Sequence, residues 1–161
     1  MLFHICQRLQ HNSWIFAVNS YPPSAALLEV VHYFSLFVVV GSAVMVDLRI
    51  LEIAARRRTL AQLGRQLFPS IWIALGFAVL SGFIMFGVAA TEYFDDGYFR
   101  RKMLIIVAGA VLTAIVQWNA AGWSRLPAMP ITAKALAIVS LSLWIGAVLA
   151  GLDVAALSGI G

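Results

Sequence analysis

Apolar residues along this chain fall into four long runs that short polar segments separate. In the first run, between Glu29 and Asp47, about 17 consecutive residues carry no full charge, enough to cross most of a bilayer core as a helix. The four runs predict spans at about 25–50, 71–90, 103–123 and 132–152. The predicted fold class is therefore all-α, an integral membrane four-helix up-and-down bundle.

Residues 1–20 differ from these runs because polar residues interrupt the apolar ones throughout. The apolar side chains recur at roughly helical spacing, which predicts a short amphipathic helix lying at the membrane surface. Pro22 and Pro23 separate this helix from the first span. The whole chain, 1–161, is expected to form a single transmembrane domain.

The composition supports a membrane protein and argues against a nucleic-acid partner. Hydrophobic residues make up 62% of the chain and charged residues 11%, whereas a soluble domain has about 45–50% and about 25%. The formal net charge is +4, but the basic residues bracket the apolar runs instead of forming a basic, aromatic surface. The lipid bilayer is the predicted partner. The single cysteine, Cys6, cannot form an intrachain disulfide.

The distribution of lysine and arginine predicts the orientation, because cytoplasmic loops carry the excess. One side of the predicted bundle has Arg49, Arg56, Arg57, Arg58, Arg65, Arg125 and Lys134, and the other has Arg8, Arg100, Arg101 and Lys102. We expect the larger set to face the cytoplasm. The protein is thus predicted to be a multi-pass protein of a bacterial inner membrane, with its N-terminus and C-terminus outside.

The candidate chemistry begins with His32, an imidazole inside the first apolar run. An ionisable group at membrane depth is expected to face the bundle interior or a polar cavity. Glu29 lies three residues earlier, on the same helix face. The predicted outward half also holds His4, His11, Met85 and Met103. Imidazole and thioether are ligands of copper and haem iron, so these six residues form the candidate cofactor site, with His32 as the metal ligand.

Four interpretations of His32 follow from this placement. It can serve as a core residue that hydrogen-bonds Glu29, a serine or a backbone carbonyl. It can ligate haem b, with a second axial ligand from His4, His11, a methionine or another subunit. It can bind or pass copper, or relay protons together with Glu29. The sequence leaves all four open.

A second polar group lies at the opposite end of the spans. Asp47 is near the membrane boundary and needs a partner. The side chains available on that side are Arg49, Arg65, Arg125, Lys134, Gln117 and Asn119. The prediction is a structural ion-pair network that joins spans one, three and four. A contact surface for a cytoplasmic partner is the alternative.

Several short motifs resemble those of known membrane families. The pattern of Pro22 or Pro23, Glu29-x-x-His32, Gly41 and Asp47-Leu48-Arg49 resembles an uncharacterised family of small four-span bacterial membrane proteins, a domain of unknown function. Gly82, Met85, Phe86, Tyr93 and the run from Phe99 to Met103 match it too. A fainter similarity, through His32 and Phe99-x-x-Lys102, is to the CopD-like copper-resistance membrane domain, which implies metal or redox work.

No enzyme motif such as HExxH, GxSxG or a Walker A loop is present in the sequence, and we expect no enzymatic activity. The predicted function is a small integral membrane subunit that binds haem b or a metal near the outer leaflet and serves electron transfer. One alternative is a copper-handling or small-solute permease component. Another is a structural membrane anchor for a partner protein. A membrane or periplasmic protein partner and a homo-oligomer are both compatible with the sequence.

Overall fold

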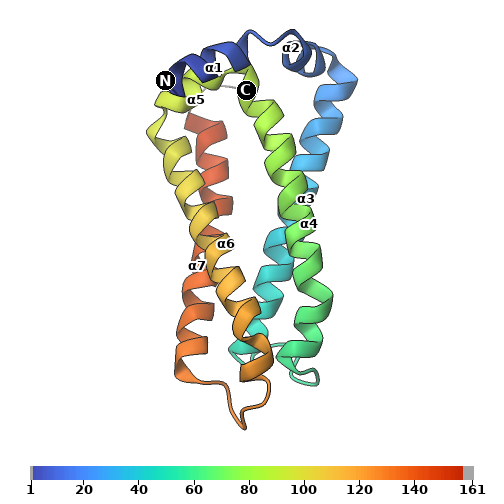
Figure 1. The fold of residues 1–161 in the computed structure, drawn as a ribbon, viewed down its shortest axis with the longest axis vertical. Helices are drawn as coiled ribbons and strands as arrows, with labels where there is room; N and C mark the ends of the chain where they lie inside the picture. The colour runs from blue at the N-terminus through green and yellow to red at the C-terminus, as the bar shows by residue number, and fades with distance from the viewer. Residues whose placement is uncertain (1, 158–161) are drawn as a thin grey trace.

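The computed structural model describes residues 2–157 as helices joined by short loops (Figure 1). Met1 and residues 158–161, with the C-terminus that was predicted outside, lie beyond the described residues, as do the side chains of residues 2 and 152–157. The helices are α1 (Leu2–Gln10), α2 (Ser13–Ser20), α3 (Pro22–Ile50), α4 (Leu60–Val88), α5 (Ala90–Asp95), α6 (Gly97–Trp123) and α7 (Ile131–Leu157). Four of them, α3, α4, α6 and α7, are long and apolar enough to cross a membrane, which confirms the predicted all-α membrane bundle.

The four long helices run up and down between two ends of the molecule (Figure 1). We call the end with α1, α2 and α5 the roof end. The opposite end is the arginine end, because its loops, residues 51–59 and 124–130, contain Arg56, Arg57, Arg58 and Arg125. Helix α3 packs along α4 and α6 packs along α7, and further contacts join α3 to α7 and α4 to α6.

Helix α3 ends in a Schellman motif that turns the chain at the arginine end. The backbone N–H of Ile53 donates to the carbonyl of Leu48 at 2.9 Å, and that of Glu52 donates to Arg49 at 3.1 Å. Glu52 has a φ of 62°, the left-handed conformation that this motif requires just after the helix. The chain therefore turns after residue 50 and leaves the helix before the arginine-rich loop.

Helix α4 begins at Leu60, well before the predicted start of the second span at residue 71. The reason is a capping box. The Thr59 hydroxyl accepts a hydrogen bond from the Gln62 N–H at 3.1 Å, and the Gln62 side chain accepts one from the Thr59 N–H at 3.0 Å. Pro69, two residues before the predicted start of this span, lies inside α4. It removes one backbone donor, a loss that a long, packed helix tolerates.

The N-terminal segment forms two short helices where one was predicted over residues 1–20. Asn12 divides them because its side chain caps α2, accepting hydrogen bonds from the backbone N–H groups of Trp14 at 3.0 Å and Ile15 at 3.3 Å. Helix α5 lies within the predicted loop between spans two and three. Together α1, α2 and α5 lie across the roof end of the bundle (Figure 1).

Side-chain contacts fix this roof to the bundle. The Thr91 hydroxyl donates to the Gln10 side chain at 2.6 Å, which joins α5 to α1. Asn19 of α2 donates to the carbonyl of Ile84 on α4 at 3.3 Å. Ile15 packs so closely on α4 that a Cβ at Gly87 would lie 2.9 Å from it. The roof is thus a packed part of the fold.

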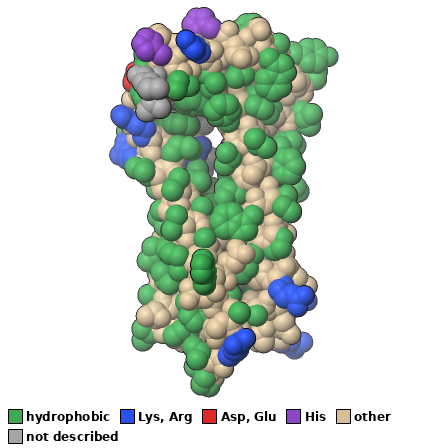
Figure 2. Space-filling model, in the orientation of Figure 1, with side chains coloured by type: hydrophobic (Ala, Val, Ile, Leu, Met, Phe, Trp, Pro, Cys, Tyr) green, Lys and Arg blue, Asp and Glu red, His purple; other side chains and the backbone are tan. Residues whose placement is uncertain are grey.

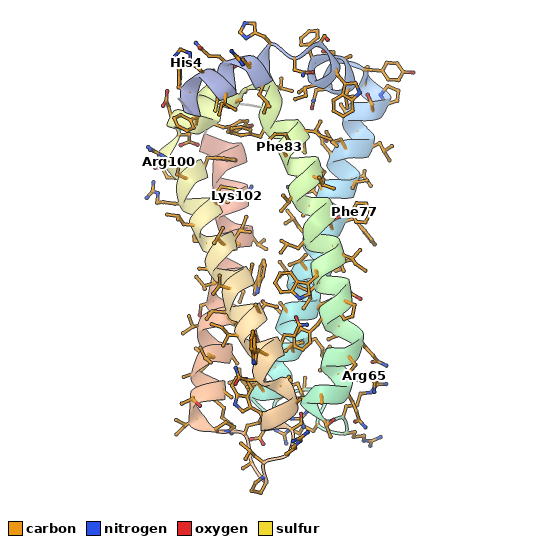
Figure 3. The ribbon with its side chains drawn as sticks, in the orientation of Figure 1. His4, Arg65, Phe77, Phe83, Arg100 and Lys102 are labelled. Atoms are coloured by element: carbon orange, nitrogen blue, oxygen red, sulfur yellow. The ribbon has the colours of Figure 1, made fainter. Side chains whose placement is uncertain are left out.

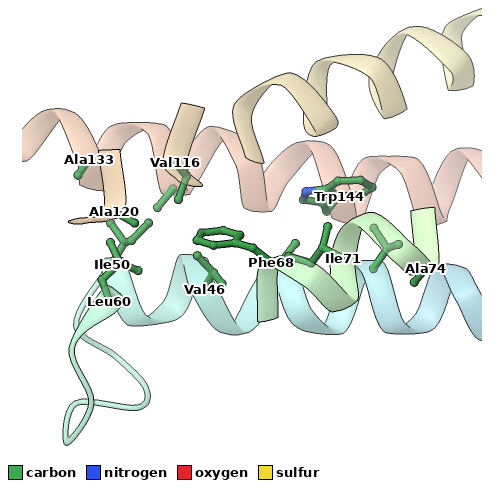
Figure 4. Packing of buried hydrophobic residues seen from close by; sticks show 13 residues of the cluster. Val46, Ile50, Leu60, Phe68, Ile71, Ala74, Val116, Ala120, Ala133 and Trp144 are labelled. Carbon is green, nitrogen blue, oxygen red and sulfur yellow. The ribbon is translucent and has the colours of Figure 1, made fainter. Parts of the chain in front are cut away.

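The hydrophobic core lies mainly in the half of the bundle toward the arginine end (Figure 4). Its largest fully buried side chain is Trp144 of α7, which is 1% exposed. The indole N–H donates to the Thr113 hydroxyl on α6 at 3.3 Å, and a Cβ at Gly109 would lie 3.2 Å from the ring. Nearer the roof, α6 has no buried residue before Gly109 among the side chains described. Helix α6 is therefore more deeply buried in the arginine half than near the roof.

Candidate functional site

His32 lies on α3, in the roof half, and its ring packs against α4. Its Nδ1 atom is 3.0 Å from the carbonyl oxygen of Ala78 and 3.0 Å from the Ser81 hydroxyl oxygen. The Ser81 hydroxyl itself donates to the carbonyl of Phe77 at 2.6 Å. Because a carbonyl oxygen only accepts, the proton of the neutral ring resides on Nδ1. The Nε2 lone pair is consequently not used by this interaction.

Gly82 provides the space for the ring. A Cβ at this position would lie 2.9 Å from His32 Cε1 and 3.3 Å from Nδ1. A heavy-atom contact of 2.9 Å between carbons is shorter than van der Waals separation, so a side chain here displaces the imidazole. Gly82 therefore positions His32. In the sequence, the feature that points to this role is a small residue next to Ser81, at the same membrane depth as His32.

An opening separates the α3–α4 pair from the α6–α7 pair just below the roof (Figure 2). Lys102 extends from α6 beside this opening, in the half that contains the roof (Figure 3). Its amino group packs near the α7 backbone, since a Cβ at Gly151 would lie 3.7 Å from Nζ. The sequence placed Lys102 just before the third span, so its position beside this opening follows only from the helix packing.

The other predicted cofactor residues lie apart from His32. Glu29 is exposed on α3, and His4 is exposed on α1. His11 is exposed between α1 and α2, where its Nδ1 atom is 2.7 Å from the Gln7 carbonyl. Both of these histidines lie on the outer surface of the roof (Figures 2 and 3). Among the described residues, the hydrogen-bond partners of His32 are Ala78 and Ser81, and Glu29 is exposed on the same helix. Helices α1 and α2 lie across the bundle end, so His4 and His11 remain on its surface.

The two methionines of the candidate cofactor site lie on different long helices. Met85 is half-buried on α4, and Met103 is 38% exposed on α6. In the described part of the chain, no group of three or more histidine, cysteine, aspartate and glutamate side chains is arranged to hold a metal ion. His32 is thus the one predicted nitrogen ligand that the described structure places within the bundle.

At the arginine end, the residues of the predicted ion-pair network have partners other than Asp47. Lys134 of α7 forms a 2.6 Å ion pair with Glu52, at the end of α3, and not with Asp47. Arg49 donates to the carbonyl of Arg58 at 2.6 Å. Arg65 and Arg125 are exposed, Asn119 donates to the Ile115 carbonyl at 2.8 Å, and Gln117 accepts from the Trp72 indole at 2.6 Å. An exposed pair forms more readily than a buried one because its charges keep part of their hydration.

The Glu52–Lys134 pair gives a pH-dependent prediction. The hydrogen bond and charge of Lys134 lower the pKa of Glu52 below its ordinary value. Because the pKa of Glu52 is lower in the folded protein, the pair stabilises the fold at pH values above the ordinary glutamate pKa of about 4.3. This stabilisation is lost as the pH falls through the pKa that Glu52 has in the folded protein. Glu52→Gln is therefore expected to lower the midpoint of thermal unfolding at neutral pH and to leave it unchanged at acid pH. Glu92→Gln, on α5, is the control; equal pH profiles for both variants would contradict the assignment.

Comparison with known proteins finds no relative: no protein-family model matches the chain, and no curated protein or solved structure matches it significantly. The motifs around Glu29–Arg49 and Phe99–Met103 accordingly identify no family. Fold and site together define a four-span helical membrane protein in which a few polar groups, His32 and Asp47 among them, lie inside an apolar bundle.

Proposed function

We propose that this chain is a small, non-enzymatic membrane subunit that binds haem b through His32 and serves electron transfer. The observation that carries the proposal is the hydrogen bond from His32 Nδ1 to the Ala78 carbonyl, at 3.0 Å. Histidines that ligate metals usually donate their other ring N–H to a carbonyl or carboxylate, which fixes the ring and strengthens the ligating nitrogen. His32 has this arrangement, with Nε2 as the available ligand.

The set of donors favours haem over a bare copper ion. A bare ion needs several protein ligands, and the described residues offer no such group of histidine, cysteine or carboxylate side chains. A porphyrin supplies its own ring nitrogens and requires only axial ligands from the protein. The opening between the helix pairs lies in the same half of the molecule as His32 (Figure 2). Bound haem would supply one-electron redox chemistry.

The chain's own residues would perform the positioning. Ala78 and Ser81 hold the imidazole, and Gly82 gives it room against α4. Lys102 supplies a positive charge on the other side of the opening, where it would balance the negative charge of a propionate. The positive-inside rule supports an arginine end in the cytoplasm, which would place His32 in the outer leaflet of a bacterial inner membrane.

An optical spectrum of the detergent-purified protein, oxidised and then reduced, tests the proposal. We expect a Soret band that shifts on reduction and that His32→Ala removes or weakens severalfold. His11→Ala is the matched control because this histidine lies on the roof surface, and its spectrum should equal that of the wild type. A folded protein with no haem after expression with added haem precursor would overturn the proposal. Stoichiometric copper in that sample would support the copper-handling alternative, and a co-purified partner with neither would support a structural anchor.

A further inference from the structure

Asp47 is a carboxyl group inside the bundle that the proposed haem site does not use. It lies on α3 in the arginine half and is 2% exposed. Its Oδ2 atom has no hydrogen-bond partner within the described part of the chain. Ser140 of α7, itself 1% exposed, is the polar side chain that acts on this carboxyl from the neighbouring helix. Val46 and Ile50, on the same helix as Asp47, belong to the buried apolar core (Figure 4).

The charged groups near this part of the bundle are engaged elsewhere. On α3 and its end, Arg49 donates to the Arg58 carbonyl, and Glu52 forms the ion pair with Lys134, the basic residue of α7. The only charged residue in the sequence of α4 is Arg65, which is exposed and extends away from the bundle (Figure 3). Helix α6 carries its charged residues near the roof and presents Thr113 and Val116 in the arginine half. No described cation therefore contacts Asp47.

An ionised carboxylate in such surroundings is strongly unfavourable, because neither water nor an opposite charge compensates its desolvation. Binding a proton removes the charge and leaves a neutral acid whose hydroxyl can donate a hydrogen bond to Ser140. We propose that Asp47, together with Ser140, is a proton-binding site in the arginine half of the bundle. The proton comes from water at the arginine end and bonds to a carboxylate oxygen.

The arginine end of the bundle contains a cavity with polar residues in its wall. Arg49 and Glu52, two and five residues after Asp47 in the sequence, line this cavity, which has a volume of about 90 Å³. Thr59 and Ser124 add polar groups to its wall. A water molecule needs roughly 10–15 Å³ of such space, so the cavity can hold several. Proton exchange with Asp47 is expected from this end because α3 ends at Ile50, about one helical turn beyond Asp47, whereas most of the helix lies toward the roof.

Infrared spectroscopy of the whole protein in lipid vesicles tests the proposal. At neutral pH we expect a carbonyl stretching band of a protonated carboxylic acid, which Asp47→Asn removes. The band should shift after transfer to heavy water, because the site exchanges protons with the solvent. Asp95→Asn, an exposed acid on α5, is the control and should leave the band unchanged.

Ser140→Ala provides an independent variant if Asp47→Asn fails to fold. Loss of the hydrogen bond should move the carboxylic-acid band to a higher frequency without removing it. The proposal is overturned if the wild-type protein shows only ionised carboxylates at neutral pH, if the band survives in Asp47→Asn, or if it never shifts in heavy water. Because the readout does not involve haem, its result is separate from that of the haem proposal.

Discussion

Replacing Trp144 by alanine is expected to lower the free energy of unfolding by about 3–5 kcal/mol, the range observed when a buried large aromatic side chain is truncated. Trp144 is 1% exposed and lies between α6 and the core, against Gly109. Its removal leaves a cavity that the surrounding helices cannot fill, and it also deprives the Thr113 hydroxyl of its indole donor. Reversible unfolding in mixed detergent micelles measures the change.

Trp118→Ala is the matched control for this prediction. The same side chain is removed from the neighbouring helix α6, but Trp118 is 89% exposed and lies on the surface that would face lipid. Loss of an exposed side chain leaves no cavity, so the change should stay within about 0.5 kcal/mol. Equal losses in the two variants would show that Trp144 is not a core residue and that the α6–α7 packing differs from that described.

Replacing Gly82 by valine is expected to displace His32 from α4 and to destabilise the bundle by about 1–3 kcal/mol, the usual effect of overpacking. A Cβ at this position alone would lie 2.9 Å from His32 Cε1. The ring must move, and the hydrogen bond to Ala78 is then lost. If His32 ligates haem, the Soret band should weaken together with the stability, and nuclear magnetic resonance of the imidazole would report the displacement directly.

Gly76→Val distinguishes this contact from a general effect of valine in α4. Gly76 lies in the same helix, and a Cβ there would meet nothing within 4 Å. Its substitution should leave His32 in place and change stability little. The double variant Gly82→Val with His32→Ala should be less destabilised than the sum of its single variants, because the clash requires both side chains. Additive losses would contradict the close packing of His32 on Gly82.

The sequence determined much of this protein because lipid restricts what a chain can do. Every backbone polar group in a membrane must be satisfied within the segment, so a long apolar run has to form a helix. The number of spans and the all-α bundle follow from that constraint alone. Helix boundaries followed less directly, since the capping box at Thr59 and Gln62 starts α4 at Leu60, well ahead of the start that the apolar run predicted at about residue 71.

The partners of the polar side chains were decided only by tertiary structure. Spacing along α3 placed Glu29 and His32 on one face, yet His32 bonds to Ala78 on α4 while Glu29 is exposed. Charge alone suggested that Asp47 pairs with Lys134, but the end of α3 brings Glu52 to that lysine. Sequence gives the depth of a residue in the membrane through helical rise. Which neighbouring side chain it contacts depends on how packing rotates each helix about its axis. It also depends on where small residues such as Gly82 allow two helices to approach closely.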